Sequence, residues 1–197
     1  MKETPKNDVS TKIQAQGTLF TIGHGVKTFD SFIEELRAYD IGYLLDIRTK
    51  PYSKWSPHFN EIPLKLALED KNIRYVYLGD KLGGLPSDRS CYDEEGKVIY
   101  NVIKEKDFFK EGLKRLITAN EKGITLAIMC SEKDPKECHR TKLIGQELLK
   151  HGISLHHIIT TMIVKSQEDV MNEITKGRST VDLFGNEVDL KSRKSYK

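Results

Sequence analysis

The chain has 197 residues, 38% of them hydrophobic and 31% charged, with a formal net charge of +3. This length suits one domain that buries its own core without disulfides, and no apolar run reaches the roughly 18 residues of a membrane span, so we expect no membrane contact. The net charge is too small to establish a polyanionic partner, and three cysteines with no signal-like N-terminus indicate a cytoplasmic protein.

Five short apolar segments are expected to form buried strands, because each is brief and bounded. In chain order they are 18–22, 41–47, 73–78, 124–130 and 153–159. Helices are predicted between or after them, with starts at Thr28, Pro63, Asp107, Pro135 and Ser166. Strands that alternate with helices predict an α/β fold, here a single domain with a mainly parallel sheet of about five strands and helices on both faces.

The two ends of the chain are polar and are expected to lie outside this domain. We expect a flexible leader over 1–17, the α/β domain over 18–176 and a polar C-terminal tail over 177–197. The pattern over 85–105 is hard to interpret, and within it 97–101 suits either a short strand or a lid segment.

Polar side chains follow three of the predicted strands. They are His24 after the first, Asp46 and Arg48 after the second, and Cys130, Glu132, Cys138, His139 and Arg140 after the fourth. Because parallel strands end at one edge of a sheet, where α/β proteins bind ligands, we expect these residues to converge on a site.

Two arginines are the candidates for holding an anion. Arg48 and Arg140 suit a bidentate grip on phosphate or carboxylate, and we group His139 with these substrate-binding residues. The alternative is that Arg48 pairs with Asp46 or Glu132 and only holds the loops together.

Four residues are the candidates for catalysis. Cys130 near a helix start and near arginines suits a nucleophile, with His24 as general base; alternatively Cys130 is a small buried hydrophobe and the His24 ring bonds a neighbouring carbonyl. Asp46 and Glu132 suit an acid/base carboxylate pair, although a nearby arginine would keep each ionised.

Aromatic and basic residues are interleaved in the loop after the second strand. Trp55 and Lys54, with Tyr52 and His58, suit a nucleotide base and its phosphate, and Asn60 of the same loop is assigned to substrate binding. Trp55 is equally suited to anchoring the loop on the core. The pair Gly83 and Gly84 would permit close approach of a phosphate, which is weak evidence.

A zinc site built from Cys130, Cys138, His139 and His24 is a further interpretation. The spacing lacks the usual close pair of ligands, so we predict no metal and no other cofactor.

The motifs TIGHG, LLDIRTKPYSKWSPHFN, IRYVYLGDKLGG and AIMCSEKDPKECHR resemble the family known as domain of unknown function 488, over 19–159. The resemblance implies an α/β fold and lends no reaction. The family's recurrent residues correspond to Gly23, His24, Asp46, Arg48, Phe59, Asn60, Gly83, Gly84, Cys130, Glu132, Cys138, His139 and Arg140. LLDIR is also similar to rhodanese-like domains, but Lys136 stands where their loop has arginine, so neither sulfur nor phosphoryl transfer is carried over.

The leading hypothesis is an enzyme that acts on a phosphate-bearing substrate, either a nucleotide or a nucleic acid. A non-catalytic nucleotide or nucleic-acid binding module and a structural zinc protein are the alternatives. In the tail, 180–184 (TVDLF) resembles the peptide that bacterial DNA-processing proteins insert into the sliding clamp. Leu183 and Phe184 would make that contact, or would instead pack on the domain itself.

Overall fold

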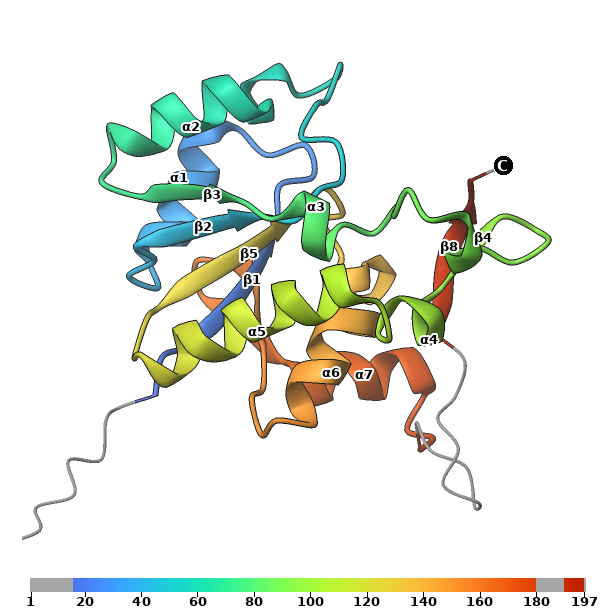
Figure 1. Ribbon diagram of the computed structural model, residues 1–197. Helices are drawn as coiled ribbons and strands as arrows, with labels where there is room; N and C mark the ends of the chain where they lie inside the picture. The colour runs from blue at the N-terminus through green and yellow to red at the C-terminus, as the bar shows by residue number, and fades with distance from the viewer. Residues whose placement is uncertain (1–15, 180–189, 197) are drawn as a thin grey trace, which may run out of the picture.

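The computed structural model describes residues 16–179 and 190–196, so that Leu183 and Phe184 lie outside the described residues. Its centre is a six-stranded sheet in the order β3-β2-β5-β1-β6-β7 (Figure 1). The strands are β1 (Leu19–Gly23), β2 (Tyr43–Asp46), β3 (Arg74–Tyr77), β5 (Leu126–Cys130), β6 (His156–Thr160) and β7 (Ile163–Ser166). All neighbours are parallel except β6 and β7, which form an antiparallel hairpin. The predicted single-domain α/β fold is confirmed, with β7 as an additional edge strand.

Helices cover both faces of the sheet, and the core is therefore divided into two layers. On one face lie α1 (Phe29–Arg37) and α2 (Glu61–Glu69); on the other lie α5 (Asp107–Glu121) and α6 (Gln146–Leu149). Successive side chains of a strand enter opposite layers, as Leu44 and Leu45 of β2 do. The remaining helices are α3 (Gly79–Leu82), α4 (Tyr100–Ile103) and α7 (Gln167–Thr175).

Several predicted helix ends are confirmed by their caps. The hydroxyl of Thr28 accepts a hydrogen bond from the Ser31 amide at the start of α1, and Ser166 and Asp169 form a capping box at the start of α7. Gly123 and Gly152 follow α5 and α6 with a left-handed φ of 71°, which glycine adopts at little cost.

The prediction that a helix begins at Pro135 is wrong by five residues, because a hydrogen bond close in sequence forms a different turn there. The Asp134 carboxylate accepts a hydrogen bond from the Lys136 amide at 2.9 Å and closes a short 3-10 turn over Pro135–Glu137. Cys138 is then extended (φ −110°, ψ 146°), and a π-helical segment, Arg140–Gly145, leads into α6. Cys138 and His139 therefore precede the helix rather than lying within its first turns.

A second, small sheet is formed by one strand from the segment 85–105, which was hard to interpret, and one strand from the predicted tail. Strand β4 (Lys97–Ile99) pairs with β8 (Lys191–Ser195) in an antiparallel arrangement, and the Ser192 hydroxyl accepts a hydrogen bond from the Val98 amide at 2.9 Å. Figure 1 shows this pair beside α4, away from the central sheet. The short strand over 97–99, one of the two readings of that segment, is therefore present.

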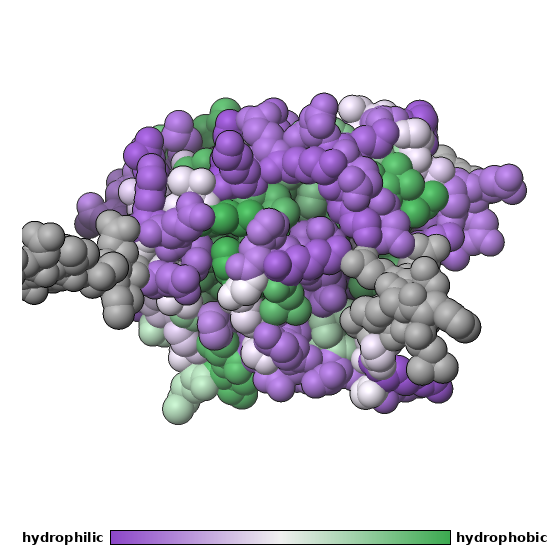
Figure 2. Space-filling model, turned by 60° about the horizontal axis from the view of Figure 1, so that its bottom comes forward, coloured by the Kyte–Doolittle hydropathy of each residue, from purple (hydrophilic) through white to green (hydrophobic). Residues whose placement is uncertain are grey.

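The helices of the described part of the chain are all too short or too polar to cross a bilayer. Figure 2 shows one face of the molecule, on which hydrophilic side chains predominate and hydrophobic ones are interspersed.

Candidate functional site

A cavity of about 440 Å³ opens beside the carboxyl ends of β2 and β5, at the edge where parallel strands present their loops. Four segments line it: the loop after β2, the stretch over 84–100, the turn after β5 and the small strand β8. Its charged and hydroxyl-bearing residues are Arg48, Thr49, Lys50, Ser87, Arg89, Ser131, Glu132, Glu137, Ser192 and Lys194, and its aromatic rings are Tyr92, Tyr100 and Tyr196.

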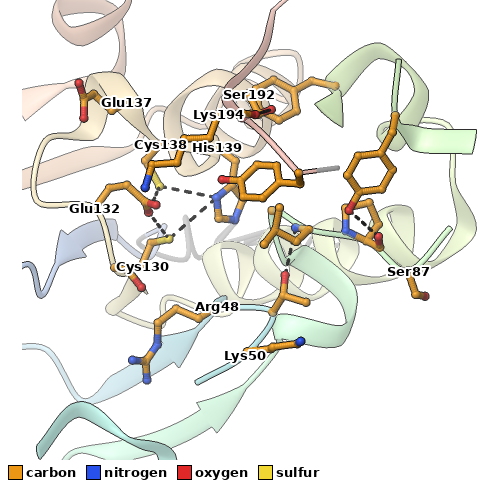
Figure 3. Close-up of a pocket in the computed structure, with 18 of the residues that line it drawn as sticks. Arg48, Lys50, Ser87, Cys130, Glu132, Glu137, Cys138, His139, Ser192 and Lys194 are labelled. Atoms are coloured by element: carbon orange, nitrogen blue, oxygen red, sulfur yellow. Dashed lines mark hydrogen bonds between the residues drawn. The ribbon is translucent and has the colours of Figure 1, made fainter. Parts of the chain in front are cut away.

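Two cysteines, a histidine and a glutamate meet on the wall of this cavity, and we call them the Cys–His cluster: Cys130, Glu132, Cys138 and His139 (Figure 3). Nδ1 of His139 lies 3.9 Å from Cys130 Sγ and 3.6 Å from Cys138 Sγ. Oε2 of Glu132 accepts from Cys130 Sγ at 2.8 Å and from Cys138 Sγ at 3.5 Å. The two sulfurs and the imidazole nitrogen thus lie within 4.8 Å of one another, and the carboxylate contacts the sulfurs, which is a donor set suited to a reactive thiol or to a metal site.

The ring of His139 is fixed with Nδ1 toward the sulfurs. Its other nitrogen, Nε2, lies 3.0 Å from the carbonyl oxygen of Leu82, so Nε2 carries the proton that the carbonyl accepts. Gly84 packs against the same ring, and any larger residue there would collide with it, because a Cβ on Gly84 would lie 2.8 Å from Nδ1. Gly84 therefore supports the site through close packing on His139.

The surroundings of the two thiols shift their pKa values in opposite directions. Burial opposes ionisation of Cys138, but the hydrogen bond from Cys130 and the positive charges of Arg140 and His139 together hold its pKa well below the usual value. The hydrogen bond with Cys138, together with burial, raises the pKa of Cys130. The surroundings therefore favour ionisation of Cys138 over ionisation of Cys130.

The remaining catalytic candidates form a separate buried network. The guanidinium of Arg48 donates to both carboxylate oxygens of Asp46, at 2.9 Å from Nε and 2.5 Å from Nη2, and also to the Phe59 carbonyl at 2.7 Å. The hydroxyl of Tyr75 donates to Asp46 Oδ2 at 2.8 Å. The pairing of Arg48 with Asp46, one of the two alternatives for this arginine, is present, and Asp46 does not line the cavity.

His24 belongs to this network and is held as a neutral ring. It stacks on Phe59 with 4.5 Å between ring centres, Nδ1 bonds the Gly25 carbonyl at 3.0 Å, and Nε2 faces Nη1 of Arg48 at 3.3 Å. Burial and the charge of Arg48 lower the pKa of His24 to about 4. Since Nε2 already has a donor, His24 is poorly placed to act as the base for Cys130.

Arg140 lies under the turn after β5 rather than in the cavity. Its side chain is buried, and Nη1 and Nη2 donate to the carbonyls of Glu132 at 2.6 Å and Lys133 at 3.1 Å. An anion gripped by Arg48 and Arg140 together would have to displace these protein acceptors. The two arginines instead hold the loops that carry the Cys–His cluster.

The aromatic loop is also separate from the cavity. Trp55 is 88% exposed, and neither it nor Lys54 lines the cavity. The amide oxygen of Asn60 accepts a hydrogen bond from the Ser53 amide at 2.6 Å and closes the loop. A Cβ on Gly83 would lie 2.4 Å from Thr49 Oγ1, so this glycine serves close packing between two loops.

Several cavity residues had not been identified from the sequence. Lys50, Arg89 and Lys194 bring positive charge, and Tyr92 and Tyr196 bring aromatic surface. Lys50 follows Arg48 by two residues and was identifiable as part of the same strand end. The others come from 85–105 and from the tail, where no local pattern indicates that β4 and β8 pair.

A family model with the description "Domain of unknown function DUF488" matches residues 28–146, more than half of the chain. This range includes β2, β5 and all four residues of the Cys–His cluster. No curated protein and no solved structure matches the chain.

Proposed function

Because the chain belongs to the family described as domain of unknown function DUF488, whose description names no reaction, we propose a function from the cavity itself. The protein is an enzyme that binds a phosphate-bearing substrate, of the nucleotide or nucleic-acid class, with the reacting bond next to the Cys–His cluster. The observation that carries this proposal is one cavity holding thiols, an imidazole and a carboxylate together with basic and aromatic side chains. A cytoplasmic location is part of the proposal.

Cationic side chains of the cavity support the anionic part of the substrate. Within residues 16–179 and 190–196, neither Lys50 nor Lys194 forms an ion pair, whereas Arg48 is neutralised by Asp46. Figure 3 shows Lys50 and Lys194 on opposite sides of the Cys–His cluster. Two lysines without carboxylate partners suit a phosphate group, which Lys binds as a point charge.

Aromatic side chains support the remainder of the substrate. The guanidinium carbon of Arg89 lies 5.8 Å from the centre of the Tyr92 ring, so a flat surface with a positive charge is already assembled at the cavity. A volume of about 440 Å³ falls in the range of small-molecule pockets and accepts one nucleotide unit. These features favour a nucleotide, or a single nucleotide unit of a strand, over a simple sugar phosphate.

Calorimetric titration with a nucleoside monophosphate, and with the same nucleoside lacking phosphate, tests the binding step. We expect the phosphate form to bind and Lys50→Gln combined with Lys194→Gln to weaken binding by at least about tenfold, since hydrogen bonds to charged groups contribute roughly 1.5–3 kcal/mol each. Lys54→Gln is the matched control, because Lys54 lies in the same loop as Lys50 but outside the cavity. Equal affinity for nucleoside and nucleotide would contradict the proposal.

The catalytic step is tested separately. Conversion of bound nucleotide or of a short single-stranded oligonucleotide, followed by mass spectrometry, is expected for the native protein and lost in Glu132→Gln. Binding of the same ligands without any conversion would favour the non-catalytic binding module. A sliding-clamp contact through Leu183 and Phe184, which lie outside the described residues, is part of the nucleic-acid branch of this proposal.

A further inference from the structure

Cys130, Cys138 and His139 bring three ligands of the kinds that zinc prefers together on the cavity wall, and we propose that they bind one zinc ion. The ligand atoms, two sulfurs and Nδ1, all lie within 4.8 Å of one another. This inference rests on the function proposed above in that it names the cofactor of the same site. Metal binding is measured without nucleotide, so each proposal can fail while the other stands.

The distances inside the cluster are close to those of a tetrahedral ion site. Zinc–sulfur and zinc–nitrogen bonds of about 2.3 and 2.0–2.1 Å at tetrahedral angles place sulfur and nitrogen about 3.6 Å apart. The observed separations from His139 Nδ1 are 3.6 Å to Cys138 and 3.9 Å to Cys130. A shift of a few tenths of an ångström brings both sulfurs into range.

The surroundings of the ligands are those of an oriented metal site. A metal-binding imidazole usually donates its other N–H to an oxygen acceptor, and Nε2 of His139 lies 3.0 Å from the Leu82 carbonyl. The backbone amide of Arg140 donates to Cys138 Sγ at 3.5 Å, as groups around a metal-bound sulfur do. The ring cannot turn freely, because Gly84 packs against it.

An ion held by these three residues would have its fourth position open to the cavity, because all three residues line it. Zinc sites with three protein ligands and one open position are of the catalytic type, whereas structural sites are closed by four. Glu132 Oε2 contacts both sulfurs, so a carboxylate lies beside the proposed ion. The cluster thereby suits metal-assisted chemistry on the substrate proposed above.

The site is tested with full-length protein that has been stripped by a chelator under reducing conditions and titrated with Co²⁺ and with Zn²⁺. We expect one equivalent of Co²⁺ to produce thiolate-to-cobalt charge-transfer absorption and one equivalent of Zn²⁺ to abolish it. Cys130→Ser, Cys138→Ser and His139→Gln should each weaken binding by at least about tenfold. Cys91→Ser is the matched control, because Cys91 is buried but lies outside the cluster.

If a variant at a ligand residue fails to fold, measurements on the native protein are sufficient to test the site. A thermal midpoint that rises with Zn²⁺ and returns with chelator, together with the cobalt spectrum, supports the site. Absence of charge-transfer absorption in native protein, or an unchanged spectrum in Cys138→Ser, overturns it. Nucleotide binding that persists after chelation would leave the cavity proposal intact even if no metal binds.

Discussion

At the scale of single residues, the buried charges of the molecule stabilise the loops around the site. The clearest example is the pair of Asp46 and Arg48, whose side chains are almost completely buried and share several hydrogen bonds. Removal of one partner from such a pair leaves an uncompensated charge, which is far more costly than removal of both.

We therefore predict that Arg48→Met lowers the free energy of unfolding by about 3–5 kcal/mol. The double variant Arg48→Met with Asp46→Asn should recover part of this loss, because the remaining side chain is then uncharged. Urea denaturation of the three proteins measures it. A single variant as stable as the native protein would mean that the carboxylate finds other partners.

Histidine burial makes the stability of the protein depend on pH. Burial and the charge of Arg140 lower the pKa of His157 from 6.5 to about 4, and its ring lies between Thr21 Oγ1 at 2.7 Å and Gln167 Oε1 at 2.9 Å. The unfolded chain then takes up a proton at a higher pH than the folded chain, so this contribution is complete above about pH 6.5 and is lost as the pH falls toward 4.

We expect the free energy of unfolding to decrease between pH 6.5 and 4, and the decrease to be smaller in His157→Gln. His24, whose pKa is also lowered to about 4, contributes in the same direction. Chemical denaturation at several pH values gives the slope, and exposed His151→Gln serves as the control. The same slope in native protein and His157→Gln would rule out this histidine as a source.

The strand-end residues were identifiable from the sequence, but their partners were not. Cys130 ends a buried strand and Glu132 follows it, so both were expected at the ligand-binding edge. That Arg140 turns under the loop, and that Cys138 and His139 join Cys130, depends on the extended backbone at Cys138, which no sequence pattern specifies.

At the scale of elements, side-chain caps decide where helices begin. The start of α7 combines Ser166 and Asp169 in a reciprocal pair, in which the Ser166 hydroxyl accepts from the Asp169 amide at 3.0 Å. This helix packs against the π-helical segment Arg140–Gly145, where Gln167 donates to the Thr141 carbonyl at 3.0 Å. The cap is therefore connected to the segment that follows the Cys–His cluster.

Ser166→Ala should lower the free energy of unfolding by about 1 kcal/mol, because the first amides of α7 lose their acceptor. Thermal or urea denaturation of the native protein and the variant measures the change. No measurable loss would indicate that water replaces the hydroxyl without cost.

The elements that the sequence predicted best were those with local signals. Apolar runs located β1, β2, β3, β5 and β6, and cap residues located α1 and α7. Strands β4 and β8 lie more than ninety positions apart in the chain. The hydrogen bond between the Val98 amide and the Ser192 hydroxyl, for example, joins residues 94 positions apart. Their pairing depends on long-range contacts, and neither segment has an alternation of apolar and polar residues that would predict it.

At the scale of the whole molecule, the C-terminal part of the chain contributes to the cavity and carries the proposed clamp-binding peptide. Strand β8 brings Ser192 and Lys194 to the cavity, while 180–184 carries the peptide that resembles a sliding-clamp ligand. The same tail would thus complete the site and attach the protein at DNA.

If the clamp contact exists, a bacterial sliding clamp should capture the native protein and not the variant Leu183→Ala with Phe184→Ala. The physical reason is that two apolar residues in a polar segment suit a partner's pocket. A pull-down with both proteins at equal concentration measures this. Failure of the native protein to bind, or equal capture of both, would end the idea and leave the cavity unaffected.

A crystal structure of the protein with a nucleoside monophosphate would show whether a phosphate-bearing ligand occupies the cavity beside the Cys–His cluster. We expect density inside the cavity, with the phosphate in contact with Lys50 or Lys194 and the rest of the nucleotide against the tyrosines. Density confined to the exposed Trp55 loop, or a cavity that stays empty while the ligand binds elsewhere, would contradict it.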